Sequence, residues 1–118
     1  MDEASRARNE LLRRAYGIIC DYGWIQRDYG DPEMGFCPVG ALAEAREELR
    51  DQARYDSESL QSGYYSALDA LQELAVLRKR VALEGIKPVH GYVRIADWND
   101  APGRTRGEVL DMLAQAQR

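Results

Sequence analysis

The residue of this sequence with the clearest chemical potential is Cys37, which directly precedes a proline. Proline is favoured at the first position of a helix, so Pro38 predicts a helix whose N-cap residue is Cys37. The unpaired amides and the positive end of a helix lower the pKa of a thiol and favour the nucleophilic thiolate. Cys37 is therefore a candidate nucleophile.

A catalytic cysteine also needs a base within hydrogen-bonding reach and a group that orients this base. The sequence offers one histidine, His90, with Asp97 or Asn99 as the orienting group. A cysteine-dependent enzyme that uses Cys37 and His90 is thus one hypothesis for the function.

The favoured interpretation of both residues is structural. Phe36, Pro38 and Leu42 surround Cys37 in the sequence and predict a thiol that is buried as a small apolar group. His90 follows a proline in a predicted loop, where a single histidine is typically a surface residue that bonds to the backbone. On this interpretation neither residue is catalytic.

Other chemistries find no support in the sequence. Structural zinc needs about four Cys or His ligands at short spacings, and the chain contains Cys20, Cys37 and His90. The glycines of residues 23–40 are not followed by the Lys-Ser/Thr pair of a phosphate-binding loop, and no serine lies in a nucleophile-elbow context. We therefore expect no metal and no cofactor.

Two short segments outside the helical patterns, residues 23–37 and 98–103, combine aromatic and polar side chains. We expect them to lie together at one end of the molecule, because the first joins two helices, the second leads into the last helix, and each contains a tryptophan that needs apolar cover. The candidate binding residues are Trp24, Gln26, Tyr29, Cys37, Trp98, Asn99 and Asp100. The alternative is structural: the aromatic residues pack against the helices, while Asn99 and Asp100 fix their own turn.

Four main helices are predicted to position these segments. Apolar residues at spacings of three and four predict helices over residues 3–22, 38–55 and 57–83, with Gly63 fraying or kinking the third. The small residues that begin the second helix, including Gly40, predict the close approach of another helix. Its acidic run from Glu44 to Asp51 is interleaved with arginines, which is typical of a solvated helix face.

The remaining segments are shorter. Residues 23–37 predict a structured loop or a small hairpin that pairs 24–26 with 34–36, and the loop is too apolar to be freely solvated. Residues 89–98 suit a short helix better than a strand. Thr105 and Glu108 form a capping box that begins the last helix. The fold class is therefore all-α: a single-domain bundle of four main helices plus a short helix, over residues 1–118.

The composition limits the partners, the cellular location and the source that the protein can have. Sixteen basic and twenty acidic residues among 118 give a net charge of −4, which argues against a general nucleic-acid binder. No apolar run approaches the roughly 20 residues that cross a bilayer. The charged N-terminus and two cysteines predict a cytoplasmic location. Fourteen arginines against two lysines suggest GC-rich coding DNA and an actinobacterial or actinophage source.

Three sequence blocks together resemble a known family. They are Gly23-Trp24-Ile25-Gln26, Cys37-Pro38-Val39-Gly40-Ala41-Leu42, and Trp98-Asn99-Asp100 followed by Thr105, Glu108, Val109 and Leu110. This pattern resembles a small actinobacterial and actinophage family of unknown function. The resemblance implies no activity, substrate or cofactor.

The sequence therefore leaves the biochemical function unknown and favours one hypothesis. A small, mildly acidic helical domain with an aromatic loop and no catalytic motif is typical of a non-enzymatic protein-interaction or regulatory domain, including a phage-encoded one that acts on a host protein in the host cytoplasm. The alternative is the enzyme that uses Cys37 and His90. The sequence predicts neither the partner nor the oligomeric state.

Overall fold

The computed structural model describes residues 2–78 and 91–118, and this part is mostly helical, which confirms the all-α fold class. A small antiparallel hairpin follows the first helix, with Gly30 opposite Phe36 and Asp31 opposite Gly35. The elements are α1 (Glu3–Tyr22), β1 (Gly30–Asp31), β2 (Gly35–Phe36), α2 (Pro38–Asp51), α3 (Ser57–Arg78), α4 (Gly91–Asn99) and α5 (Arg106–Ala116).

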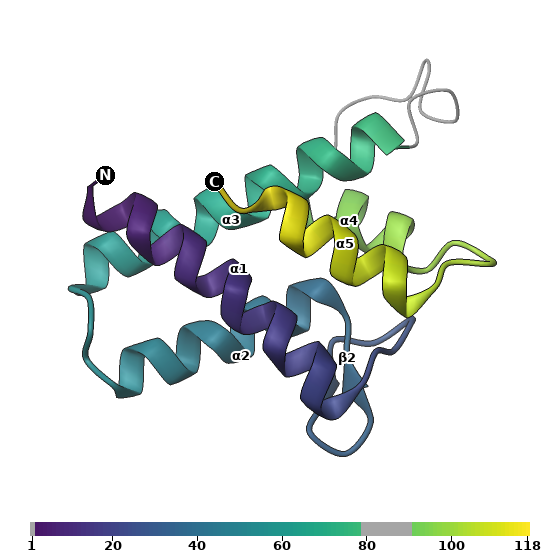
Figure 1. The fold of residues 1–118 in the computed structure, drawn as a ribbon, viewed down its shortest axis with the longest axis horizontal. Coiled ribbons are helices and arrows are strands. Elements are labelled where there is room, and N and C mark those ends of the chain that lie inside the picture. The colour runs from purple at the N-terminus through teal and green to yellow at the C-terminus, as the bar shows by residue number, and fades with distance from the viewer. Residues whose placement is uncertain (1, 79–90) are drawn as a thin grey trace.

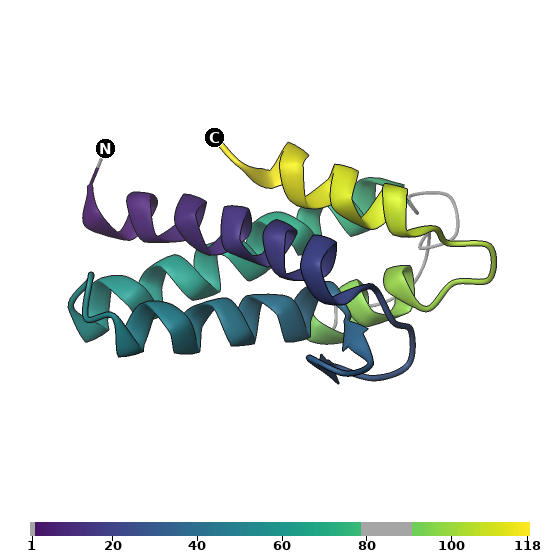
Figure 2. The same cartoon turned by 60° about the horizontal axis from the view of Figure 1, so that its bottom comes forward.

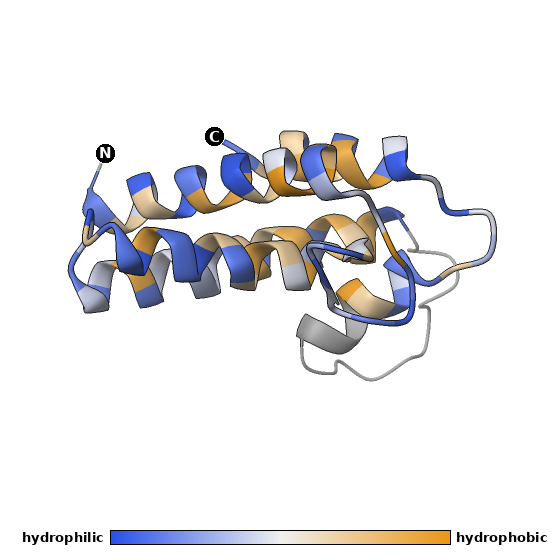
Figure 3. Cartoon of the chain, turned by 90° about the horizontal axis from the view of Figure 1, so that it is seen from below, coloured by the Kyte–Doolittle hydropathy of each residue, from blue (hydrophilic) through white to orange (hydrophobic). Residues whose placement is uncertain are grey.

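Helix α3 occupies the centre of the bundle and contacts the other four helices. Helices α1 and α5 form one layer and α2 and α4 lie in the other (Figures 1 and 2), and α1 packs directly against both α2 and α3. Their hydrophobic residues face the space between the two layers, while hydrophilic residues cover the outside (Figure 3). Within residues 2–78 and 91–118, no helix is long and apolar enough to cross a membrane.

The core confirms the helical stripes predicted from the sequence. Its largest fully buried side chains include Leu11, Leu12, Leu42, Leu71, Trp98 and Leu113, from all the helices. Burying a side chain of this size contributes roughly 1.5–3 kcal/mol to the stability of the fold. Removal of apolar surface from water therefore holds the helices together.

Gly63 has a different role from the one that the sequence suggests. It is buried inside α3, and a Cβ atom at this position would lie 2.8 Å from the carbonyl oxygen of Ala4, the Cβ of Ala7 and the amide nitrogen of Arg8. The expected fraying of the first turns is wrong, because α3 is helical without interruption from Ser57 to Arg78. The small size of Gly63 lets α1 and α3 pack closely.

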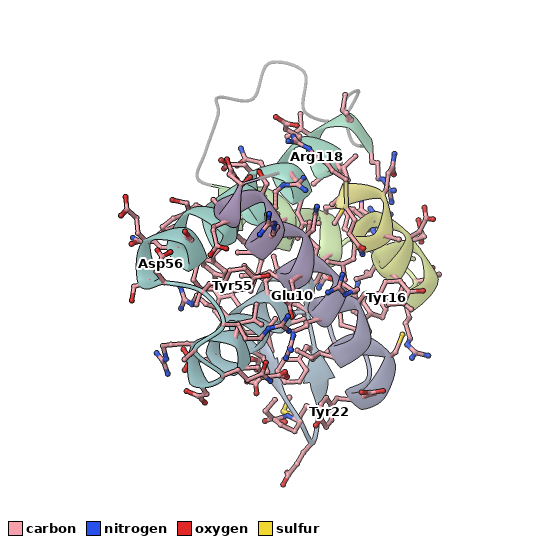
Figure 4. All side chains as sticks on the ribbon, turned by 60° about the vertical axis from the view of Figure 1, so that its left-hand side comes forward. Glu10, Tyr16, Tyr22, Tyr55, Asp56 and Arg118 are labelled. Atoms are coloured by element: carbon pink, nitrogen blue, oxygen red, sulfur yellow. The ribbon has the colours of Figure 1, made fainter. Side chains whose placement is uncertain are left out.

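A buried carboxylate joins α1 to the connection between α2 and α3. The Glu10 side chain is 5% exposed and accepts hydrogen bonds from Arg14 Nε at 3.2 Å, from Tyr55 Oη at 2.8 Å and from Arg54. Figure 4 shows Glu10 and Tyr55 directed toward one another. Burial, followed by the bond to Glu10, raises the pKa of the Tyr55 hydroxyl. Because Glu10 is paired with two arginines, its burial is compatible with a stable fold.

Two boundaries differ from the sequence prediction. Helix α2 ends at Asp51 rather than near Tyr55, because Ala53 adopts a left-handed conformation with φ of 52° that no helix continues. The first hairpin strand is Gly30–Asp31 rather than 24–26. Trp24 instead forms an isolated parallel bridge with Phe36.

The last two helices agree with the sequence where the structure describes them. Residues 91–99 are helical, as expected, and Thr105 caps α5 in a reciprocal capping box with Glu108. The predicted end of α3 at residue 83 and the predicted start of the short helix at residue 89 lie outside the described residues.

Candidate functional site at the hairpin end

The loop after α1 and the turn after α4 are joined by side-chain hydrogen bonds. Trp24 Nε1 donates to Asn99 Oδ1 at 2.6 Å, and Gln26 Nε2 donates to the carbonyl oxygens of Asn99 and Ala101 at 2.9 and 3.1 Å. The predicted proximity of the two segments is confirmed. They form one hydrogen-bonded junction at the end of the bundle that carries the hairpin.

The side chains of Asn99 and Asp100 serve this junction as well as their own turn. Asn99 Nδ2 donates to the carbonyl oxygen of Ile25 at 3.1 Å, and Asp100 Oδ1 accepts from the amide of Arg27 at 2.8 Å. Their bond to each other, also 3.1 Å long, is the local one. Beyond the turn that the sequence predicted them to fix, the two side chains bond to partners more than seventy residues away.

Trp98 belongs to the core rather than to the surface. Its side chain is fully buried, and the guanidinium carbon of Arg104 lies 4.0 Å from the centre of its ring. Arg104 Nε also donates to the Trp98 carbonyl oxygen at 2.8 Å. The structural interpretation of Trp98 as a core residue agrees with this position, and its ring is not available to a ligand.

Cys37 is the N-cap of α2, as predicted, and its Sγ accepts a hydrogen bond from the amide of Gly40 at 3.3 Å. The expected drop in its pKa is wrong. Burial raises the pKa of the thiol and outweighs the opposing hydrogen bonds from the amides of Gly40 and Val39. The thiol is therefore mostly protonated at neutral pH. His90 lies outside the described residues.

Tyr29 combines a fixed backbone with an exposed ring. Its carbonyl oxygen accepts from the amide of Cys37 at 3.1 Å, and a Cβ atom on Gly40 would lie 1.9 Å from the same oxygen. The close approach expected at Gly40 is thus made by this loop rather than by a helix. The Tyr29 side chain is 62% exposed, whereas Phe36 is buried and Trp24 is half-buried. The expectation that the whole apolar loop packs inward is therefore wrong for Tyr29.

Two hollows flank Tyr29, and Val39 lines both of them. The first, the Cys37 hollow, has a volume of about 420 Å³, and its lining includes Arg27, Asp28, Cys37, Asn99 and Asp100. The second, the Glu44 hollow, has a volume of about 380 Å³, and its lining includes Phe36, Ala43, Glu44, Glu47 and Tyr64.

Residues 27–51, which contain the hairpin and α2, carry the negative charge of the protein. Seven acidic residues against three arginines give this acidic segment a net charge of −4, equal to that of the whole chain. Across residues 2–78 and 91–118, no group of three or more His, Cys, Asp or Glu side chains is placed to hold a metal ion.

Comparison with known proteins places the chain in a family. A family model described as a family of unknown function, DUF6197, matches residues 4–118. The chain belongs to the DUF6197 family. No curated protein and no solved structure matches it. The resemblance to a family of unknown function is thus confirmed, and membership in DUF6197 by itself implies no reaction, substrate or partner.

The structure of this DUF6197 protein brings together most of the residues singled out from the sequence. Tyr29, Cys37, Asn99 and Asp100 line the Cys37 hollow, and Trp24 and Gln26 bond to the turn behind it. Whether these residues bind a ligand stays a prediction.

Sequence reasoning missed the Glu44 hollow. Its wall combines a stripe of α2 at intervals of three and four residues, Gly40, Ala43, Glu44 and Glu47, with Tyr64 from α3. The spacing of these residues is visible in the sequence, but acidic residues at this spacing are typical of a solvent-exposed helix face. Only the packing of the hairpin and α3 beside α2 turns this face into a hollow.

Proposed function

We propose that this protein is a non-enzymatic protein-interaction domain whose partner docks on the hairpin end. The observation that carries the proposal is Tyr29, which is 62% exposed while its carbonyl oxygen is fixed by the amide of Cys37 at the N-cap of α2. Aromatic side chains, tyrosine and tryptophan above all, supply much of the binding energy of protein interfaces. A ring on a backbone that is already ordered loses less entropy when a partner binds.

A second exposed apolar side chain supports the same surface. Met34 is 52% exposed at the turn of the hairpin. Its amide and that of Glu33 donate to Asp31 Oδ1 at 2.8 and 2.9 Å, so the turn that presents Met34 is itself fixed. Methionine adapts to irregular partner surfaces and is common at such interfaces.

Charge favours a basic partner. The acidic segment, residues 27–51, has a net charge of −4 and contains both Tyr29 and Met34. Such a field speeds association with a positively charged protein surface and disfavours nucleic acid. The arginine-rich composition supports an actinobacterial or actinophage source, and we place the interaction in that cytoplasm, where a phage-encoded copy acts on a host protein.

The geometry at Cys37 gives the cysteine-dependent alternative little support. A catalytic thiol benefits from a lowered pKa and an accessible sulfur, whereas Cys37 is buried, caps α2 through its Sγ and has a raised pKa. The same contacts explain Cys37 as a structural residue.

The test is capture of a partner from a lysate of the source organism with wild-type protein, Tyr29→Ala and the control Tyr16→Ala. Tyr16 is 36% exposed on α1 and lines neither hollow. We expect a stoichiometric partner that is lost with Tyr29→Ala and retained with Tyr16→Ala. A partner that both variants retain, or both lose, would contradict docking on the hairpin end.

A further inference from the structure

We infer that the partner places an arginine side chain in the Glu44 hollow. This inference rests on the proposed function, because it names the chemistry that the same surface recognises. It follows from three features of the hollow: an apolar floor, a carboxylate without an ion-pair partner, and an aromatic ring at the edge.

The floor suits the hydrocarbon part of a long side chain. Phe36 and Val39 are buried apolar residues, and Ala43 adds a methyl group from the next turn of α2. The volume of about 380 Å³ accommodates one extended side chain that enters from the surface. Arginine and lysine bury their methylene stems on such surfaces and keep the charged group near a polar edge.

Glu44 supplies the negative charge at that edge. Its side chain is half-buried, and among the side chains that the structure describes, those of residues 2–78 and 95–118, it has no ion-pair partner. Its neighbour Glu47 pairs with Arg50, and Glu48 lies 3.8 Å from Arg14. Glu44 is thus the carboxylate of this helix face that lines the hollow and remains free to receive an added cation.

Aromatic rings favour arginine over lysine. Tyr29 also lines the hollow and is 62% exposed, so a guanidinium that binds there has an exposed tyrosine ring to stack against. The protein already uses this interaction at Tyr64, another residue that lines the hollow, where the guanidinium carbon of Arg46 lies 4.2 Å from the centre of the ring. A planar guanidinium can also bond to a carboxylate through two parallel donors.

The experiment measures binding of two blocked tripeptides, Ala-Arg-Ala and Ala-citrulline-Ala, by amide chemical shifts of the labelled full-length chain. Citrulline has nearly the shape of arginine but carries no charge. We expect the arginine peptide to shift the amides of Gly30, Gly40 and Glu44. The citrulline peptide should bind about tenfold more weakly, because a charge-assisted hydrogen bond is roughly twice as strong as a neutral one.

Glu44→Gln should lower the affinity for the arginine peptide by a similar factor, whereas the control Glu58→Gln should leave this affinity unchanged. Glu58 is an exposed acid in the first turn of α3, so its variant removes the same charge away from the hollow. Glu44→Asp, which retains the carboxylate, should preserve part of the affinity. The spectra themselves report whether each variant is folded.

The inference is overturned if the arginine peptide shifts none of these amides up to its solubility limit, or if both peptides bind equally well. It is also overturned if Glu44→Gln and Glu58→Gln weaken binding to the same extent. These results leave docking through Tyr29 intact, since that proposal is tested by partner capture with Tyr29→Ala. If Tyr29→Ala still captures the partner while the arginine peptide binds the hollow, the hollow is an arginine site that does not contribute to partner docking.

Discussion

Trp24 Nε1 donates a 2.6 Å hydrogen bond to Asn99 Oδ1, which joins two segments that are 75 residues apart in the sequence. The same Asn99 side chain donates to the carbonyl oxygen of Ile25. One amide group therefore satisfies a donor and an acceptor of the loop after α1, and it fixes the loop that carries Tyr29. Stability and the proposed docking surface depend on the same residue.

Asn99→Ala should destabilise the fold by about 2 kcal/mol, because it leaves the Trp24 indole and the Ile25 carbonyl without these partners. Urea denaturation measures the effect. Gln61→Ala, at an exposed position of α3, is the control and should change stability by less than about 0.5 kcal/mol. Equal stability of the two variants would show that the junction contributes little.

The two cysteines should differ in reactivity. Cys37 is buried and burial raises its pKa, whereas Cys20 is exposed, so iodoacetamide should label Cys20 much faster at neutral pH. Mass spectrometry of the labelled chain measures both rates. Labelling of Cys37 should become fast only after denaturation in urea. Rapid labelling of Cys37 in the folded protein would revive the catalytic hypothesis.

Two leucines of α3 test the position of the core. Leu71 is fully buried, so Leu71→Ala should cost roughly 2–5 kcal/mol of unfolding free energy through lost burial and the cavity that remains. Leu77 is 63% exposed, and Leu77→Ala should have a small effect. Denaturant melts of both variants compare the same chemical change on one helix. A larger loss of unfolding free energy with Leu77→Ala than with Leu71→Ala would contradict the assignment of the Leu71 face of α3 to the core.

Two helical glycines should respond in opposite directions to alanine. Gly63→Ala forces a methyl group against the backbone of α1 and should destabilise the protein by about 1–3 kcal/mol. A Cβ atom on Gly17 meets nothing within 4 Å, so Gly17→Ala should stabilise α1 by about 0.5–1 kcal/mol through helix propensity. Thermal melts measure both changes. A stabilising Gly63→Ala would contradict the close contact of α1 and α3.

Acid should weaken the helix caps. The amide of Ser59 donates to Asp56 at 2.8 Å and lowers the pKa of that carboxylate. Because the folded pKa lies below the unfolded one, this stabilisation is complete above about pH 4, where unfolded Asp titrates, and is lost as the pH falls through the folded pKa.

Asp56→Asn retains a capping oxygen that does not titrate, so its stability should fall less steeply than that of wild type below about pH 4. Urea denaturation across this range provides the measurement. Asp69→Asn removes a carboxylate from the interior of α3 and is the control. An unchanged slope in Asp56→Asn would mean that this cap does not contribute to acid unfolding.

Local sequence determined the helices and their caps. The apolar stripe and Gly23 defined α1, Pro38 placed Cys37 at the N-cap of α2, and Thr105 with Glu108 began α5. These features are predictable because helix periodicity and capping depend on residues within about four positions of each other.

The tertiary structure decided what these local rules cannot reach. Burial against neighbouring elements raised the pKa of Cys37, although its N-cap position alone predicted the reverse. Asn99 found its partners across the molecule, and the hairpin and α3 converted the acidic face around Glu44 into a hollow. Each outcome depends on contacts between segments distant in the sequence, so desolvation and long-range hydrogen bonding, rather than local propensity, set the chemistry of the hairpin end.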